Sequence, residues 1–315
     1  MIQPEPGGPQ FPSLASCLPA ALRYQPSQKA LPMHIKILGS AAVGGFPQWN
    51  CTCPNCDGLR RGALRTKART QTQLAFSPMS GVWFLVGASP DLRAQILATP
   101  DLAPSSETPS PIAGLFLCSA DLEDIAGLLQ LRGIGSAFVF VTPAVQKIVK
   151  AESRIFPSVD GSTAAVQWQA LSARRRIGCH LSENSEDAPT FFYTAVPVGG
   201  AYPAHLAEEA RRSLPTEEAH TAFLLEQSDR KILIAPRICG GSSEWLKAAE
   251  SADVALLDAN YWRELLEQFP RDAKTRKILL RLHHESPLLD ESSEEHRAAV
   301  EAGFEIAYDG LEIKL

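Results

Sequence analysis

The stretch GGFPQWNCTCPNC at residues 44–56 places three cysteines within six positions, at Cys51, Cys53 and Cys56. Thiolates at this spacing, in a turn that contains Pro54, can point into one small volume, as a tetrahedral zinc site requires. A redox pair of the CxxC type is the main alternative, although the helix start typical of such a pair is missing, and unliganded thiols are a third interpretation. The cluster therefore predicts a structural zinc site that a distant residue completes.

The fourth ligand of this site is expected to be a distant residue that carries a neutral imidazole or another thiolate. His283 and His284 are the only adjacent pair among the seven histidines, and they follow the strand-like run KILLRL. A neutral imidazole is a usual partner of three thiolates on zinc. A polar strand end without a metal is the simpler alternative for this pair.

The composition is that of a soluble globular protein, with 315 residues, 45% of them hydrophobic, and a formal net charge of -5. This charge gives no basic field for phosphates, so nucleic acid and anionic membranes are excluded as main partners. No apolar run is long enough for membrane insertion. A small-molecule partner is expected, and a homodimer is compatible with the composition.

The cysteine usage indicates a reducing compartment, and hence a cytoplasmic protein, because the seven cysteines show no disulfide framework spacing. Four of them lie singly along the chain, at Cys17, Cys118, Cys179 and Cys239. Single cysteines in or beside apolar runs are most simply buried small hydrophobic residues.

The chain divides into a leader and one folded domain. Residues 1–32 are rich in Pro, Gly, Gln and Ser and predict a disordered leader, with Met33 as a candidate start. From residue 33 onward, short apolar runs such as VWFLVGA and KILIAPRI alternate with helical patterns such as DLRAQILAT. Because strands occur in both halves with no obvious linker, residues 33–315 predict a single α/β domain with two packed sheets covered by helices.

Several stretches of the chain closely resemble the family of the B protein of pyrroloquinoline quinone (PQQ) biosynthesis, within the metallo-β-lactamase fold superfamily. The similarity covers residues 33–315, and its matching stretches are ILGSAAVGGFPQWNCTCPNC, ARTQTQLAFS, GASPDLRAQ, AGLLQLR and SPLLDESSEEHRAAVEAGFEIAYDG. The resemblance implies a four-layer αββα sandwich with its active site at one sheet edge. It also implies that the three clustered cysteines hold zinc. The spacing in a related phosphodiesterase of the superfamily places His284 as the fourth ligand and Arg281 at an active-site position.

The catalytic metal motif of the superfamily, HxHxDH, is degenerate in this chain. The matching loop reads SADLEDIAG at residues 119–127, and the resemblance adds a later acid and an arginine where a histidine is expected. Carboxylates without imidazole suit Mg²⁺, Mn²⁺ or Ca²⁺ better than zinc or iron. Alternatively, the arginine pairs with the carboxylates and replaces the metal. The second metal (iron, manganese or none) therefore stays open, and the motif positions are Ser119, Asp121, Glu123, Asp124, Asp258 and Arg281.

Other polar residues are expected around this centre. Ser89, Asp91 and Arg93 follow a strand and are candidate substrate-binding residues, with helix capping by Asp91 as the simpler alternative. In GGAYPAHL, Tyr202 is a further candidate for substrate binding. His205 is the best surviving imidazole for acid–base work, although a structural role is commoner for a single histidine. No role is assigned to His220.

The resemblance implies a function in PQQ biosynthesis, acting on or carrying a precursor derived from glutamate and tyrosine. An iron-dependent hydroxylase of the tyrosine ring is one interpretation. The missing imidazoles favour a second, a non-catalytic carrier of PQQ or its precursor with a role in transport, and a degenerate metal-dependent hydrolase is the third. If the chain is an enzyme, the expected catalytic residues are Glu123, Asp124, Asp258, His205 and Arg281.

Overall fold

The computed structural model describes residues 32–106, 110–131, 136–152, 165–181, 190–204, 206–239, 243–269 and 274–315. The strands are β1 (His34–Gly39), β2 (Gln73–Met79), β3 (Val82–Val86), β4 (Ile112–Phe116), β5 (Ser136–Val141), β6 (Ala165–Ala170), β7 (Arg176–His180), β8 (Thr190–Pro197), β9 (Thr221–Gln227), β10 (Arg230–Ala235), β11 (Val254–Asp258), β12 (Arg276–Leu280), β13 (Phe304–Ile306) and β14 (Glu312–Lys314). The α-helices are α2 (Pro54–Arg60), α3 (Leu92–Leu97), α4 (Leu122–Ile125), α5 (Pro143–Lys147), α6 (Glu208–Arg212), α7 (Glu244–Glu250), α8 (Trp262–Gln268) and α9 (Glu294–Glu301). Short 3₁₀ segments lie at Pro100–Leu102, Ala126–Leu131, Thr216–Glu218, Ala259–Tyr261 and Pro287–Leu289, and a π-helical segment at Ile148–Glu152.

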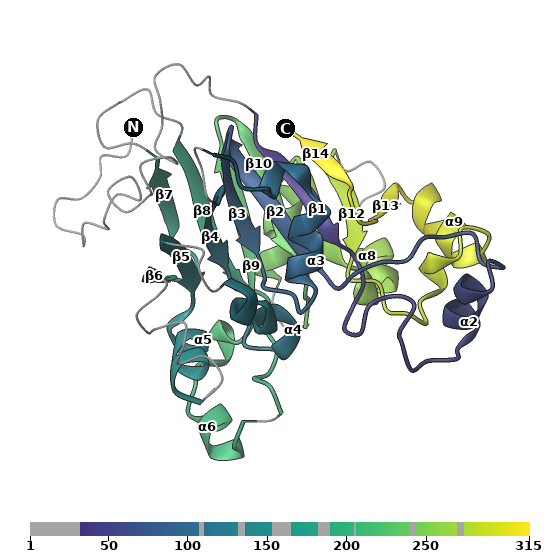
Figure 1. Ribbon diagram of the computed structural model, residues 1–315, viewed down its shortest axis with the longest axis horizontal. Helices are drawn as coiled ribbons and strands as arrows, with labels where there is room; N and C mark the ends of the chain where they lie inside the picture. Colours follow the sequence, from purple (N-terminus) through teal and green to yellow (C-terminus); the bar gives the residue numbers. More distant parts are fainter. Residues whose placement is uncertain are drawn as a thin grey trace.

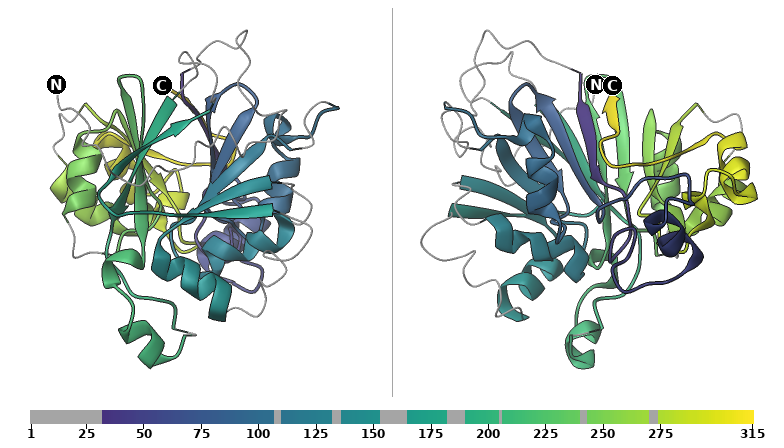
Figure 2. Two further views of the ribbon diagram at one scale, coloured as in Figure 1. Left: turned by 90° about the vertical axis from the view of Figure 1, so that its left-hand side faces the viewer. Right: turned by 45° about the vertical axis from the view of Figure 1, so that its right-hand side comes forward.

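Over the described part of the chain, the strands form two seven-stranded mixed sheets, in the orders β14-β1-β2-β3-β4-β5-β6 and β13-β12-β11-β10-β9-β8-β7. In the first sheet β3 to β6 run parallel to one another, and in the second β10 to β13 do so. The other neighbouring pairs are antiparallel. Figures 1 and 2 show the two sheets face to face, with helices on both outer sides. The predicted αββα sandwich is confirmed.

Three hydrophobic clusters account for the four layers. In β3, Val82, Phe84 and Val86 point into the core between the sheets, whereas Trp83 and Leu85 point to the outer face beneath the helices. A strand that is buried on both faces reads as a continuous apolar run, as this one does. On the outer face of the second sheet, residues of α7, α8 and α9 form the third cluster.

The carboxyl ends of β4, β10, β11 and β12 meet at one edge of the sandwich. Parallel strands end on the same side of a sheet, and functional groups gather there because loops begin at this edge. Since β9 runs antiparallel to β10, β9 starts at this edge. Backbone hydrogen bonds join the two sheets here: Thr221 N donates to Cys118 O at 2.8 Å, and Leu282 N donates to Ser40 O at 2.9 Å.

Two further predictions concern the leader at the N-terminus and membrane insertion. The predicted leader lies almost wholly in residues 1–31, outside the described residues. Among the helices that the structure describes, none has the length and apolar character needed to span a bilayer.

Candidate functional site

The structure brings the three clustered cysteines and His284 together. One ligand atom from each of Cys51, Cys53, Cys56 and His284 lies within 4.8 Å of the other three. The Sγ atom of Cys53 is 3.6 Å from Nδ1 of His284. Three thiols and one imidazole at such separations fit the donor set and size of a tetrahedral zinc site.

Local structure explains how this cysteine cluster forms. Cys53 is the N-cap residue of α2, and Pro54 occupies the first helical turn, where its missing N–H costs nothing. Asn55 ties the turn to the distant segment, because its Nδ2 donates to the carbonyl oxygens of His284 at 3.1 Å and Ser286 at 3.0 Å. Burial opposes ionisation of Cys53, but hydrogen bonds from Cys56 N and His284 outweigh it and lower the pKa of Cys53 to about 7. Figure 1 shows α2 beside α9, far from its sequence neighbours in the first sheet.

A second group of charged residues occupies the edge where β4, β10, β11 and β12 end. Arg237 Nη2 is 2.9 Å from Asp121 and 2.5 Å from Glu123. Arg281 is 3.3 Å from Glu123 and 3.5 Å from Asp258. These five residues are called the ion-pair cluster below. Arg281 was expected here from the sequence, whereas Arg237 was missed because no motif marks it.

Two acids of the predicted centre accept hydrogen bonds from loops at this edge: Asp258, which belongs to the ion-pair cluster, and Asp124, which does not. Asp258 is buried and accepts hydrogen bonds from Ile238 N at 3.2 Å and from Asn260 N at 3.0 Å. Burial raises the pKa of Asp258, and the charge of Arg281 partly opposes this shift. Asp124 accepts a hydrogen bond from Ser119 Oγ at 2.5 Å, and burial raises the pKa of Asp124 as well.

His220 belongs to this edge, although the sequence suggested no role for it. The ring is buried just before β9, with Nε2 at 3.1 Å from Asp121 Oδ2 and Nδ1 at 3.2 Å from Gly199 O. Burial favours the neutral ring, but contacts with Asp121 and Cys239 outweigh burial and raise the pKa of His220 to about 9. The imidazole is therefore cationic at neutral pH, and it helps to lower the pKa of Asp121 against the effect of burial.

The scattered cysteines differ in environment. Cys118 and Cys179 are buried, as expected for small hydrophobic residues. Cys239 is only partly exposed rather than buried, and its Sγ lies 3.6 Å from His220 Nδ1. The interpretation of Cys239 as a buried hydrophobic residue is therefore wrong, because this residue is partly exposed and its thiol contacts an imidazole.

The ion-pair cluster does not fit a divalent metal ion. A hard cation needs several free carboxylate oxygens in one shell. Here guanidinium nitrogens approach oxygens of Asp121, Glu123 and Asp258, and a cationic imidazole shares Asp121 with Arg237. The carboxylates that a second metal would need are therefore already paired with positive charge.

Most of the remaining predicted site residues make hydrogen bonds within the fold, one is exposed, and one lies outside the described residues. Ser89 is buried, and its Oγ accepts from Asp91 N at 3.1 Å. Asp91 stands at the N-cap position of α3 without capping it, because its carboxylate accepts from Gln71 N at 2.9 Å. Arg93 is exposed on α3. Tyr202 is buried and donates its hydroxyl to Pro215 O at 2.7 Å, and His205 lies outside the described residues.

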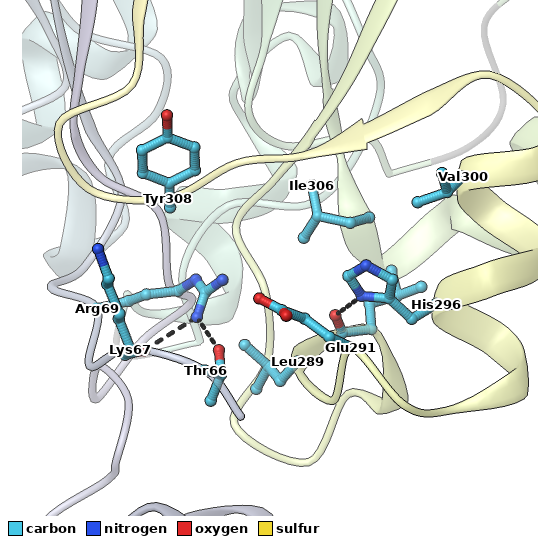
Figure 3. Close-up of a pocket in the computed structure, with 10 residues that line it drawn as sticks. Thr66, Lys67, Arg69, Leu289, Glu291, His296, Val300, Ile306 and Tyr308 are labelled. Carbon is cyan, nitrogen blue, oxygen red and sulfur yellow. Dashed lines mark hydrogen bonds between the residues drawn. The ribbon is translucent and has the colours of Figure 1, made fainter. Parts of the chain in front are cut away.

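A cavity of about 400 Å³ lies apart from these groups, between residues 66–69 and the C-terminal segment. Figure 3 shows Lys67, Arg69 and Tyr308 on one side of it and His296 and Val300 on the other, with Glu291 between. Arg69 Nη1 donates to Thr66 Oγ1 at 2.8 Å, and burial lowers the pKa of Arg69. None of the lining residues was a candidate from the sequence, and none belongs to the ion-pair cluster. The lining is completed by Leu288, Leu289 and Ile306.

Comparison with known proteins gives the family. The model of the beta-lactamase superfamily domain matches residues 82–299. The crystal structure of Zn²⁺-bound PqqB from Methylobacterium extorquens superposes with a TM-score of 0.76 and 26% identity, over 90% of this chain and 100% of that chain. A diphosphatase from the PhnP family shares the fold, with a TM-score of 0.60 and 16% identity over 90% of this chain and 98% of that chain.

Two curated relatives carry the same name. Coenzyme PQQ synthesis protein B of Azotobacter vinelandii is 30% identical over 311 residues, which cover 90% of this chain and 100% of the relative. The protein of that name from Pseudomonas entomophila is 31% identical over 315 residues, with the same coverage. The resemblance seen in the sequence is confirmed. With near-complete coverage of both partners at this identity and the shared sandwich, the chain belongs to the coenzyme PQQ synthesis protein B family, on the metallo-β-lactamase fold.

Proposed function

We propose that this chain acts in PQQ biosynthesis by binding a carboxylate-bearing precursor or PQQ itself at the ion-pair cluster, without a redox metal at that position. Family membership supports the pathway. The binding role is carried by one observation, the convergence of Arg237 and Arg281 at the edge where the two sheets meet. A precursor derived from glutamate and tyrosine bears carboxylates, which guanidinium groups bind with two parallel hydrogen bonds.

The cluster has the features of a site that can exchange one carboxylate for another. Glu123 contacts both arginines and its side chain is 23% exposed, so it is the carboxylate that an incoming acid would displace. Nε of Arg237 is buried and has no hydrogen-bond partner among the described residues. A buried donor without a partner is costly, and a bound ligand oxygen would satisfy it.

We also propose that Cys51, Cys53, Cys56 and His284 hold a structural zinc ion. The ion would supply no reaction, only a crosslink between α2 and the segment that follows β12. Because His284 lies three residues after Arg281, this crosslink would fix the loop that carries Arg281. The Zn²⁺-bound structure of the relative from Methylobacterium extorquens supports the choice of metal.

Binding of PQQ to the purified zinc-loaded protein tests the proposed site. Arg281→Gln should weaken binding about tenfold or more, because it removes a charge-assisted pair worth about 1.5–3 kcal/mol. Arg212→Gln on α6 is the matched control, since the Arg212 side chain is 78% exposed and pairs with its helix neighbour Glu208. Absence of PQQ binding to the unaltered protein, or equal binding by both variants, would contradict the site.

The pathway is tested separately in cells. A strain that lacks its own B protein should regain PQQ production when it expresses this chain, and no recovery would contradict the pathway. Iron-dependent hydroxylation by the purified protein would reject the metal-free binding role in favour of a hydroxylase.

A further inference from the structure

Cys239, His220 and Asp121 form a continuous row beside the ion-pair cluster. Cys239 Sγ is 3.6 Å from His220 Nδ1, and His220 Nε2 is 3.1 Å from Asp121 Oδ2. The three residues come from the loop after β10, the position just before β9 and the N-cap position of α4. A thiol, an imidazole and a carboxylate in this sequence of contacts are the components of an activated cysteine nucleophile.

The backbone at Gly200 is shaped around this row. A Cβ atom on Gly200 would lie 2.2 Å from His220 Nδ1 and 2.9 Å from Cys239 Sγ, closer than real contacts allow. Its φ of 111° is also a conformation that other residues rarely adopt. Glycine at this position therefore lets the main chain pass close to the imidazole and the thiol, with Gly199 O at 3.2 Å from Nδ1.

Charged and titratable groups surround the row. The groups that face His220 are Asp121 and Cys239, and Arg237 shares the same oxygen of Asp121. The phenol of Tyr261 lies near Cys239, and burial raises the pKa of Tyr261, so this neighbour stays neutral at physiological pH. A cysteine reacts as its thiolate, and an imidazole in contact with the sulfur is the proton partner that such a nucleophile needs.

We propose that Cys239 is a nucleophile, with His220 as its proton partner and Asp121 as the positioning residue, and that it adds to quinones and similar conjugated carbonyl compounds. The choice of quinones rests on the proposed role in PQQ biosynthesis; the activation of the thiol does not. A thiolate is a soft nucleophile, and conjugate addition requires an acid beside it, which His220 Nδ1–H supplies.

The reaction balances without a further oxidant or reductant. Sγ forms a C–S bond to an electron-poor ring carbon, and the π electrons of that C=C bond move to the conjugated carbonyl oxygen. This oxygen takes the proton from His220 Nδ1. The hydrogen on the attacked carbon then leaves as a proton, and the second carbonyl oxygen takes one up from solvent. Thiol and quinone together give a thioether of the hydroquinone.

Alkylation with iodoacetamide tests the activation of Cys239 in the zinc-loaded protein. The rate at each cysteine is followed by peptide mass mapping between pH 6 and pH 8.5. When the pH falls from 8.5 to 6, the alkylation rate of an ordinary thiol drops about a hundredfold, because the thiol becomes protonated. The alkylation rate of Cys239 should drop by no more than about threefold. Cys118 and Cys179, which are 2% and 3% exposed, are controls in the same sample and should stay unmodified.

The measurement on the unaltered protein does not depend on whether a variant folds. A drop of about a hundredfold in the alkylation rate of Cys239 between pH 8.5 and pH 6 would show an ordinary thiol and contradict the inference. His220→Gln should slow alkylation of Cys239 at pH 6 by about tenfold or more. An unchanged rate in this variant, with the same circular dichroism spectrum as the unaltered protein, would also contradict it.

Reaction with 1,4-benzoquinone tests the substrate class. An adduct on Cys239, absent in Cys239→Ser, is expected, and no adduct on a reactive Cys239 would reject quinones as substrates. PQQ binding and recovery of PQQ production are separate measurements. Missing adducts with intact binding would therefore reject this inference and leave the proposed function standing.

Discussion

Arg281 has a φ of 64°, in the left-handed region that residues other than glycine seldom occupy. The next residue, Leu282, is held on both sides by backbone hydrogen bonds, to Ser40 O at 2.9 Å and from Ala42 N at 2.8 Å. These bonds fix the main chain just after β12, and the guanidinium group lies between Glu123 and Asp258. Unusual backbone angles persist where the surrounding structure fixes them, and they often mark functional sites.

Replacing one cysteine of the proposed zinc site should remove the metal and destabilise the fold. Cys53→Ser is expected to lower the free energy of unfolding by several kcal/mol, roughly 3 or more, because a structural site contributes its binding free energy to folding. Thermal unfolding in chelator-free buffer measures the effect. The exposed neighbour provides the control: Thr52→Ser should leave the melting temperature unchanged, and equal melting of both variants would contradict the zinc site.

His220 should make stability depend on pH. Its pKa is raised from 6.5 to about 9 in the folded protein. The stabilisation is therefore fully present below pH 6.5 and is lost as the pH rises through about 9. Relative to His220→Gln, the unaltered protein should lose up to about 3 kcal/mol in unfolding free energy between pH 6 and pH 10, measured by urea denaturation. Parallel pH profiles for the two proteins would show that the imidazole is not paired as described.

The residues of the site differ in how far the sequence could predict them. The clustered cysteines are neighbours in the chain, so their convergence is largely a local property, and Arg281 and Asp258 follow from motif positions. Arg237, His220 and Cys239 carry no motif. Their contacts depend on β4, β9 and β10 ending or starting at one edge, which is a consequence of topology that local patterns do not encode.

At the scale of elements, the loops after β1 and before β2 are held by a residue near the C-terminus. Asp309 accepts hydrogen bonds from Ser40 N at 2.9 Å, Ser40 Oγ at 2.7 Å, Thr70 N at 2.6 Å and Thr70 Oγ1 at 2.8 Å. One carboxylate thus serves two loops at the edge that also carries Arg281. The strands themselves were readable from apolar runs, whereas this connection joins residues that are about as far apart as the domain allows.

Removing this carboxylate should loosen the edge. Asp309→Ala is expected to lower the unfolding free energy by about 3 kcal/mol, because it leaves buried donors without an acceptor. Asp309→Asn keeps one acceptor oxygen and should cost less. Urea denaturation of both variants measures which loses more unfolding free energy. An alanine variant as stable as the unaltered protein would show that the loops do not depend on Asp309.

Helix ends show a similar limit on prediction. The pattern SSEEHRAAVEAG indicates a capping box, with a serine and a glutamate three residues apart. In the structure the cap is Ser293, whose Oγ accepts from His296 N at 3.0 Å, so the residue at the reciprocal position is a histidine. This pattern predicts the helix, but the choice between the two adjacent serines depends on how the chain enters the helix from the 3₁₀ segment Pro287–Leu289.

For the molecule as a whole, the two sheets meet over a core rich in aromatic rings. Phe116 stacks on Phe140 with ring centroids 4.2 Å apart, and it contacts Phe223 of the opposite sheet edge-on at 5.2 Å. The sandwich was predictable because both sheets supply continuous apolar strands. Of the ion pairs between their edges, that of Arg281 with Glu123 followed from the resemblance, whereas those of Arg237 with Asp121 and Glu123 were not predicted.

Truncating this core should be costly. Phe116→Ala is expected to lower the unfolding free energy by about 3–5 kcal/mol, through lost burial and the cavity that remains. Val300→Ala shortens an exposed side chain on α9 and should change the unfolding free energy by less than about 0.5 kcal/mol. Similar values for the two variants in urea denaturation would contradict the assignment of the central core.

The replacement of a catalytic metal by paired arginines and carboxylates is tested most directly by the metal content of the purified protein. Cells are grown with zinc, iron and manganese, and the metals per chain are measured by inductively coupled plasma mass spectrometry. One zinc ion per chain is predicted, absent from Cys53→Ser and retained in Glu123→Gln. A second bound ion that disappears in Glu123→Gln would contradict the account, because it would show that a metal, and not Arg237 and Arg281, occupies the edge between the sheets.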